Sequence, residues 1–246
     1  MRILALNSSP RGNGISKTGL LLDALAKGMR EAGADVDIVQ LRKKSVKNCI
    51  GCYTCWTKTP GVCVHDDDMT KELFPKWLES DIVVYATPLY HYTVNARMKV
   101  FIERTLPAWE PFMNRVDGRT HHPIRQKPPK AVVLSVAGFP EPSVFSYLSS
   151  YVNMLFGKGL LAEIYRPAAE VMTLPLFQEK AQTILDATAQ AGRELIQSTK
   201  ISKETIDKIT VPIIEDFDSF ATMANSFWKT CIQEGLTPSE FQKKFG

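Results

Sequence analysis

Short apolar segments alternate with amphipathic helical segments along the first 200 residues, and this alternation limits the folds open to the chain. The run DIVVYATP at 81–88 is continuous enough for a strand that is buried on both faces. After the first apolar run, RILALN at 2–7, the residues Leu21, Leu25 and Met29 follow at i, i+4 and i+8. Alternation of strand and helix predicts βαβ units and a parallel sheet that helices cover on both sides.

Five strands are predicted, which favours an α/β fold with a doubly wound, five-stranded parallel sheet in the flavodoxin-like order 2-1-3-4-5. We expect these strands at 2–7, 35–41, 81–88, 130–138 and 160–166, and later helices near 144–156 and 176–199. In sheets of this kind, ligands bind beyond the C-terminal ends of the strands.

The last part of the chain does not continue the alternation. We predict a domain over residues 1–200 and a helical C-terminal extension over 201–246. The extension is too apolar to be disordered, and it carries the aromatic side chains Phe217, Phe220, Phe227 and Trp228. Because such side chains need a surface to cover them, we expect a homodimer or homotetramer.

Composition excludes several function classes. The 246 residues carry a net charge of +4 that is spread along the chain, so no basic block indicates a nucleic-acid partner. No apolar run approaches the length of a membrane span, and the N-terminal run is too short for a signal peptide. These features indicate a cytoplasmic protein without a membrane partner, in which cysteines stay reduced.

Four of the five cysteines lie within one short stretch, CIGCYTCWTKTPGVC at 49–63, with the spacing C-x2-C-x2-C-x7-C. In a reducing compartment, clustered thiols bind a metal or do redox chemistry more often than they form disulfides. Two short gaps suit iron–sulfur ligation from one loop. A zinc site that includes His65 and a C-x-x-C redox pair are the alternatives. The fifth, Cys231, is expected to be a packed thiol.

The segment NSSPRGNGISKT at 7–18 follows the first strand and leads into a helix. A helix N-terminus offers unpaired N–H groups and a positive dipole end, which suit a phosphate. The segment is neither a Walker A motif nor G-x-G-x-x-G, so a mononucleotide is favoured over a dinucleotide. An ordinary loop with an N-capping serine is the alternative.

A second segment, TPLYHYT at 87–93, follows the third strand at the same predicted edge of the sheet. Its aromatic faces and backbone amides suit a flavin, which the protein tunes by contact and hydrogen bonding. If the segment at 7–18 were not suited to a phosphate, the preferred interpretation would be that the tyrosines simply cover the end of the sheet.

These two segments, NSSPRGNGISKT and TPLYHYTVNARMKVFIERT, resemble the NADPH-dependent FMN reductase group of flavodoxin-like proteins. With the cysteine stretch between them, the chain resembles the iron–sulfur flavoproteins of that group. The resemblance covers roughly residues 1–200 and is firmest over 1–106. It implies an FMN-binding domain, with NAD(P)H as the electron donor.

The resemblance also implies roles for particular residues. The FMN phosphate would bind at Ser9, Arg11, Ser16 and Thr18. The isoalloxazine ring would lie along Pro88, Leu89, Tyr90 and His91, with Ala137 and Gly138 on its other side. A [4Fe–4S] cluster would be held by Cys49, Cys52, Cys55 and Cys63. Because the cysteine loop leaves the second strand at its C-terminal end, we expect this cluster beside the flavin.

We therefore predict an FMN-dependent NAD(P)H oxidoreductase that passes electrons to a small-molecule acceptor or a redox protein, with no catalytic side chain assigned. The alternatives are a cluster-free FMN or quinone reductase and a non-enzymatic, flavodoxin-like electron carrier. Asp66, Asp67 and Asp68 are expected to cap the helix that begins near Met69. The pair His121 and His122 lies in a long connector and receives no role.

Overall fold

Five parallel strands form the sheet that the sequence predicts, in the order β2-β1-β3-β7-β8, and a short sixth strand, β4, pairs antiparallel with β3. The computed structural model describes residues 1–12 and 14–245. The strands of this sheet are β1 (Arg2–Asn7), β2 (Asp35–Gln40), β3 (Ile82–Tyr90), β4 (Thr93–Val94), β7 (Lys130–Val136) and β8 (Leu160–Arg166). The prediction of the fold is therefore confirmed.

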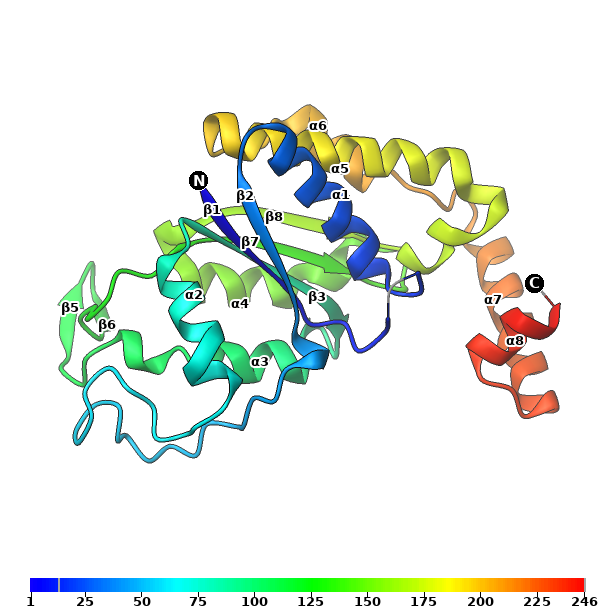
Figure 1. Ribbon diagram of the computed structural model, residues 1–246. Helices are drawn as coiled ribbons and strands as arrows, with labels where there is room; N and C mark the ends of the chain where they lie inside the picture. The colour runs from blue at the N-terminus through cyan, green and yellow to red at the C-terminus, as the bar shows by residue number, and fades with distance from the viewer. Residues whose placement is uncertain (13, 246) are drawn as a thin grey trace. The chain divides into compact units, whose positions relative to one another are not determined.

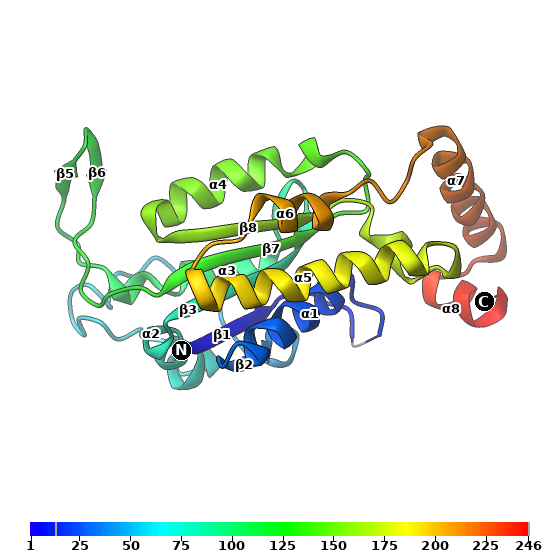
Figure 2. The same ribbon diagram turned by 90° about the horizontal axis from the view of Figure 1, so that it is seen from above.

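Helices cover both faces of the sheet (Figure 1). The helices of this part are α1 (Lys17–Glu31), α2 (Phe74–Glu79), α3 (Ala96–Glu103), α4 (Ser146–Phe156), α5 (Gln178–Ser198) and α6 (Lys203–Thr210). On one face, Trp77 of α2, Phe101 of α3 and Leu148 of α4 pack into one buried cluster with strand residues such as Val83 and Val133. The helices α1 and α5 lie side by side over the opposite face (Figure 2).

The contact between α1 and α5 is made by backbone rather than by long side chains. A methyl group on Gly28 of α1 would stand 1.7 Å from the carbonyl oxygen of Ala189 in α5. A methyl group on Gly192 of α5 would stand 2.2 Å from the carbonyl oxygen of Leu25. Both glycines are thus required by the close approach of the two helices.

The connector between α3 and β7, expected to be a loop, contains a small hairpin. The strands β5 (Asn114–Val116) and β6 (Arg119–His121) pair antiparallel between α3 and β7. The turn between them is formed by Asp117 and Gly118, which both have positive φ. An Asp-Gly turn is a strong hairpin signal, but the short, exposed strands lack the apolar alternation that would have indicated them.

The chain forms two compact units, Met1–Val211 and Pro212–Gly246. In the first, α6 packs on α5, and the buried Arg166 at the end of β8 donates 2.7 Å hydrogen bonds to the carbonyls of Ile209 and Val211. The predicted boundary at residue 200 would separate these groups.

The second unit is helical. It comprises α7 (Phe217–Glu234) and α8 (Pro238–Phe245), with Asp216 as N-cap and Gly235 as C-cap of α7. Phe227 contacts both Trp228 and Phe241 through its ring. Among the described residues of the whole chain, no helix is both long and apolar enough to cross a membrane.

Candidate functional site

The loop after β1 is tied down by its own side chains. The Oγ atom of Ser16, the N-cap of α1, accepts a hydrogen bond of 2.9 Å from the backbone N–H of Gly19. The Oγ atom of Ser9 accepts one of 3.3 Å from the N–H of Arg11. Each hydroxyl therefore acts as an acceptor within the loop and keeps its own hydrogen to donate. Ser9, Ser16 and Thr18 are all buried at this helix N-terminus.

Two cations belong to this loop, and one acidic side chain interacts with both of them. Arg11 Nη1 lies 2.7 Å from Oε1 of Glu170, which follows β8. Burial lowers the pKa of Lys17, and the charge of Glu170 partly offsets this effect. Glu170 could not be predicted as part of this site, because only the strand order brings residue 170 to the end of β1.

The turn after β3 is a two-residue connection between β3 and β4. His91 and Tyr92 both adopt positive φ, 46° and 64°. Two left-handed residues form the turn that suits a tight hairpin, but Asn and Gly normally occupy these positions. The side chains of Tyr90 and His91 are exposed, whereas Pro88 is buried and Leu89 is half-buried. The turn thus holds aromatic groups out of the sheet at a cost in backbone strain, a pattern associated with functional sites.

Asn95, another residue that the sequence analysis missed, follows this turn. It is buried and caps α3, because its side-chain oxygen accepts a hydrogen bond of 3.1 Å from the N–H of Met98. An Asn before a helical segment is a common N-cap signal that could have been noted.

The loop after β7 completes this edge of the sheet. Ala137 is buried, and its carbonyl accepts a hydrogen bond of 2.9 Å from the N–H of Ala169. Gly138 is exposed, and a methyl group there would stand 3.8 Å from Cγ of Glu170. The structure therefore brings the loops after β1, β3 and β7 to one edge, as the parallel order requires.

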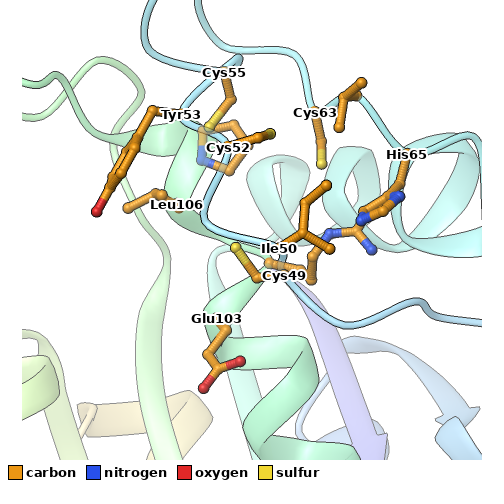
Figure 3. Close-up of a pocket in the computed structure, with 12 residues that line it drawn as sticks. Cys49, Ile50, Cys52, Tyr53, Cys55, Cys63, His65, Glu103 and Leu106 are labelled. Carbon is orange, nitrogen blue, oxygen red and sulfur yellow. The ribbon is translucent and has the colours of Figure 1, made fainter.

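The four clustered cysteines line one pocket, and their side chains surround a common space in Figure 3. All four are free thiols; Cys55 is buried, Cys63 is half-buried, and Cys49 and Cys52 are exposed. A turn over Thr59–Val62 returns the chain, because Gly61 donates a hydrogen bond of 2.9 Å to the carbonyl of Cys55. The stiff Thr-Pro-Gly segment thus brings Cys63 back to the other three.

The thiols influence one another electrostatically. Burial raises the pKa of Cys55, and the neighbouring Cys63, Cys49 and Cys52 raise it further. Hydrogen bonding to Thr54 lowers the pKa of Cys52. Within the described ranges, no three His, Cys, Asp or Glu side chains are already arranged to hold a metal ion together. His65 lines the pocket, and its Nε2 lies 3.0 Å from the carbonyl of Asn48.

The pocket also contains a buried cation. Arg104, the C-cap of α3, is 2% exposed and pairs with Asp67 through Nη1–Oδ2 and Nη2–Oδ1 distances of 2.7 and 3.0 Å. Asp67 also accepts hydrogen bonds from the N–H groups of Met69 and Thr70. The helical turn that begins at Met69 has Asp68 at its N-cap position, and the side chain of Asp68 makes no cap hydrogen bond. The ion pair was missed because residues 67 and 104 meet only in the folded chain.

The cysteine pocket and the turn after β3 lie at opposite ends of α3. Asn95 caps the helix at the turn, whereas Glu103, Arg104 and Leu106 line the pocket. Eight helical residues span about 12 Å. The strand order alone predicted that the cysteines would lie beside the loops expected to bind the flavin, but residues at the C-terminal end of α3 line the cysteine pocket.

The remaining candidates have structural contacts. The ring of His122 lies 4.9 Å from that of Trp56, which joins the hairpin segment to the cysteine loop. His121 is exposed on β6. Cys231 is buried within α7, in agreement with a packed thiol.

The parallel sheet and the loops at its C-terminal edge define a flavodoxin-like α/β protein. The sequence profile of the NADPH-dependent FMN reductase family matches residues 1–140, more than half of the chain. The chain therefore belongs to this family.

Comparison with individual proteins agrees. The chain is 40% identical over 107 residues to a protein named iron-sulfur flavoprotein from Archaeoglobus fulgidus; the match covers 44% of this chain and 46% of that protein. The chain thus spans about half the length of this curated relative. An NAD(P)H:quinone oxidoreductase from Methanothermobacter marburgensis has a similar structure, with a TM-score of 0.58, 20% identity and coverage of 79% of this chain and 96% of that one.

A further solved structure is an FMN-dependent NADH-azoreductase from Bacillus anthracis in complex with FMN. Its TM-score is 0.58 at 13% identity, and the match covers 79% of this chain and 99% of that one. At these identities the two structures establish the shared fold only.

Proposed function

We propose that this protein is an FMN-dependent NAD(P)H oxidoreductase that binds FMN at the C-terminal edge of its sheet. Family membership supports this proposal. The observation that carries it is the convergence of the loops after β1, β3 and β7 at that edge. Bound FMN would accept a hydride from NAD(P)H and pass electrons to a small-molecule acceptor or a redox protein.

The loop after β1 fits a phosphate group. Its buried hydroxyls at Ser9, Ser16 and Thr18 keep donors for phosphate oxygens, and the N-terminus of α1 adds unpaired N–H groups. Arg11 and Lys17 supply positive charge at the same place. These residues would hold and orient the cofactor rather than react.

The other two loops fit a flat aromatic ring. Pro88, Leu89, Tyr90 and His91 would lie along one side of it, and Ala137 with Gly138 along the other. The strained turn presents Tyr90 and His91 outward, where they would exclude water from the ring. No side chain is assigned as an acid or a base.

We further propose that Cys49, Cys52, Cys55 and Cys63 hold a [4Fe–4S] cluster. The donor set fits, because four thiols surround one space and the adjacent Arg104 is buried with an Nε–H that has no acceptor among the described residues. A buried cation suits an anionic metal–thiolate centre. The name of the Archaeoglobus fulgidus relative supports this proposal. The second candidate is the cluster-free reductase, because among the described residues no three His, Cys, Asp or Glu side chains are arranged to hold a metal ion together.

Anaerobic purification tests both parts of the proposal. We expect one FMN per chain, NAD(P)H oxidation, broad absorbance near about 400 nm and about four irons per chain. Replacing any one of the four clustered cysteines by Ala should remove the cluster and leave FMN bound, and Cys231→Ala should change neither. A protein that binds flavin but takes up no iron after reconstitution would exclude the cluster and support the cluster-free reductase. A protein that binds flavin but does not oxidise NAD(P)H would support the non-enzymatic electron carrier.

Replacement of Arg11 tests whether the loop after β1 binds the phosphate of FMN. Arg11→Ala should weaken FMN binding about tenfold or more, because a charge-assisted contact is lost. Riboflavin binding should not change. Equal affinity of the unaltered protein for FMN and riboflavin would show that the loop after β1 holds no phosphate.

A further inference from the structure

The cysteine loop emerges from a narrow neck, which consists of residues 45–48 on one side and 65–70 on the other. Two hydrogen bonds join its sides: the N–H of Ser45 donates to the side-chain Oδ2 of Asp68 at 2.7 Å, and the N–H of Asp68 donates to the carbonyl of Ser45 at 3.1 Å. Lys47 N donates to Asp67 Oδ2 at 2.9 Å. The neck therefore sets where the cysteine stretch begins and ends.

Arg104 contacts both sides of this neck from outside the loop. Its Nη1 donates to the carbonyl of Lys47 at 2.6 Å, and its two terminal nitrogens form a fork with Asp67. Its Nη2 also lies 3.3 Å from Oγ1 of Thr70, a hydroxyl that donates to the carbonyl of His65. Only a planar guanidinium can serve these acceptors together.

The same side chain faces the thiols. Arg104 lines the cysteine pocket, and its third nitrogen, Nε, is buried without an acceptor among the described residues. Burial lowers the pKa of Arg104, but its contacts with Asp67 and Cys63 outweigh this effect and raise it. A buried N–H beside a thiol is the kind of donor that tunes metal-bound sulfur.

We propose that Arg104 is a positioning residue for the cysteine pocket. From α3, Arg104 joins the two sides of the neck, and it directs its remaining N–H and its charge at the sulfur atom of Cys63. The role toward a metal–thiolate centre rests on the proposed function. The role in holding the loop does not, because it follows from contacts within the polypeptide.

The test compares five variants of the full-length protein. Arg104→Met removes the fork and the charge, and Arg104→Lys removes the fork alone. Because Arg104→Met leaves Asp67 as an unpaired buried carboxylate, the protein with that single change could fail to fold. The double variant Arg104→Met with Asp67→Asn avoids this unpaired charge, and Asp67→Asn is also made alone. Lys99→Met, on the exposed side of the same helix, is the matched control.

The first measurement is hydrogen exchange of the backbone over residues 45–70 in metal-free protein. In the double variant, we expect exchange in this segment to become about tenfold faster or more, with the sheet unchanged. The Lys99→Met protein should match the unaltered protein. Unchanged exchange in a folded double variant would overturn the proposed role of Arg104.

The second measurement is iron, sulfide and FMN content after anaerobic reconstitution, followed by the reduction potential. We expect iron to fall below about half in the double variant while FMN is retained. The potential is compared between variants that change one charge, because the double variant loses a positive and a negative charge together. Any cluster in Arg104→Met should have a lower potential, because a nearby positive charge stabilises the reduced form, whereas Arg104→Lys should stay near the original value and Asp67→Asn should have a higher one. Equal potentials in all variants would overturn the electrostatic part.

The two measurements separate this inference from the proposed function. An unaltered protein that takes up no iron would refute the cluster and with it the role of Arg104 toward a metal. The exchange rates would still decide whether Arg104 holds the loop.

Discussion

The side-chain amide of Asn95 donates a hydrogen bond of 2.7 Å to the backbone carbonyl of Ser8. Asn95 follows the turn after β3, and Ser8 begins the loop after β1. The backbone N–H of Asn95 also donates to Oγ1 of Thr87 at 3.2 Å, and the N–H of Ser8 donates to the carbonyl of Ala86 at 2.9 Å. The two loops assigned to the flavin are thus fixed to one another by a buried side chain.

Replacing this amide by a carboxylate should therefore weaken flavin binding. Asn95→Asp keeps an acceptor for the N–H of Met98, but it places an oxygen against the carbonyl of Ser8. An unmade buried hydrogen bond costs about 1–3 kcal/mol, so we expect a lower melting temperature and FMN affinity reduced about tenfold. Fluorescence titration with FMN measures the affinity. Asn114→Asp, in the exposed hairpin, is the control, and an unaltered affinity in Asn95→Asp would contradict the coupling of the loops.

Glu170 should oppose the binding of FMN. Its carboxylate pairs with Arg11 and lies on the side of the loop where a phosphate would add about two negative charges. Glu170→Gln frees Arg11 and removes the repulsion, so FMN affinity should rise about threefold to tenfold at low salt and less at high salt. Riboflavin serves as the ligand control. An equal gain for riboflavin would mean that the change acts on the ring and not on the phosphate.

The close approach of α1 and α5 predicts a large effect of one methyl group. Gly28→Ala places that group against the Ala189 carbonyl, and neither helix backbone can yield locally. Overpacking of this kind costs about 1–3 kcal/mol or more, which denaturant titration would measure. Gly159→Ala is the matched control, since no atom lies within 4 Å of a methyl group there. Equal stabilities of the two variants would contradict the helix contact.

Stability in acid should depend on Asp67. Burial alone would raise the pKa of Asp67, but hydrogen bonds from Arg104 and from the N–H groups of Lys47 and Thr70 hold it well below its usual range. A pKa lowered by folding contributes stability that is complete above the unfolded value of about 3.9 and is lost as the pH falls below it. In Asp67→Asn this contribution is absent.

The comparison is made by denaturant unfolding between pH 6 and pH 2. The unfolding free energy of the unaltered protein should fall more steeply below about pH 4, by at most about 1.4 kcal/mol per pH unit relative to Asp67→Asn. Asp66→Asn is the control, because that carboxylate is exposed. Parallel curves for Asp67→Asn and the unaltered protein would show that Asp67 is not held ionised.

The sequence was sufficient to predict the sheet, because a continuous apolar run such as 81–88 within a βαβ pattern is nearly always a buried strand. It was also sufficient for the Thr-Pro-Gly turn, which local chemistry determines. It could not reveal Glu170 beside Arg11 or Arg104 beside Asp67, because these pairs are distant in sequence and are joined only by strand order. The position of the cysteine pocket at the C-terminal end of α3 could not be predicted either, because spacing within the loop does not show which distant residues it contacts.

The C-terminal unit should join copies of the chain. On α7, Phe217, Met223, Trp228 and Ile232 are 40–78% exposed, an unusually apolar surface for a helix in water. We predict a homodimer or homotetramer whose interface includes this helix.

Truncation after Val211 removes α7 and α8 but keeps the carbonyls that Arg166 contacts, so the first unit should remain folded. Light scattering coupled to gel filtration should then show a smaller assembly, with less FMN retained. The double variant Trp228→Ser with Ile232→Ser should act in the same direction, and Lys229→Ser, on the same helix, should not. A truncated protein that keeps both its assembly mass and its FMN would show that residues 212–246 serve neither purpose.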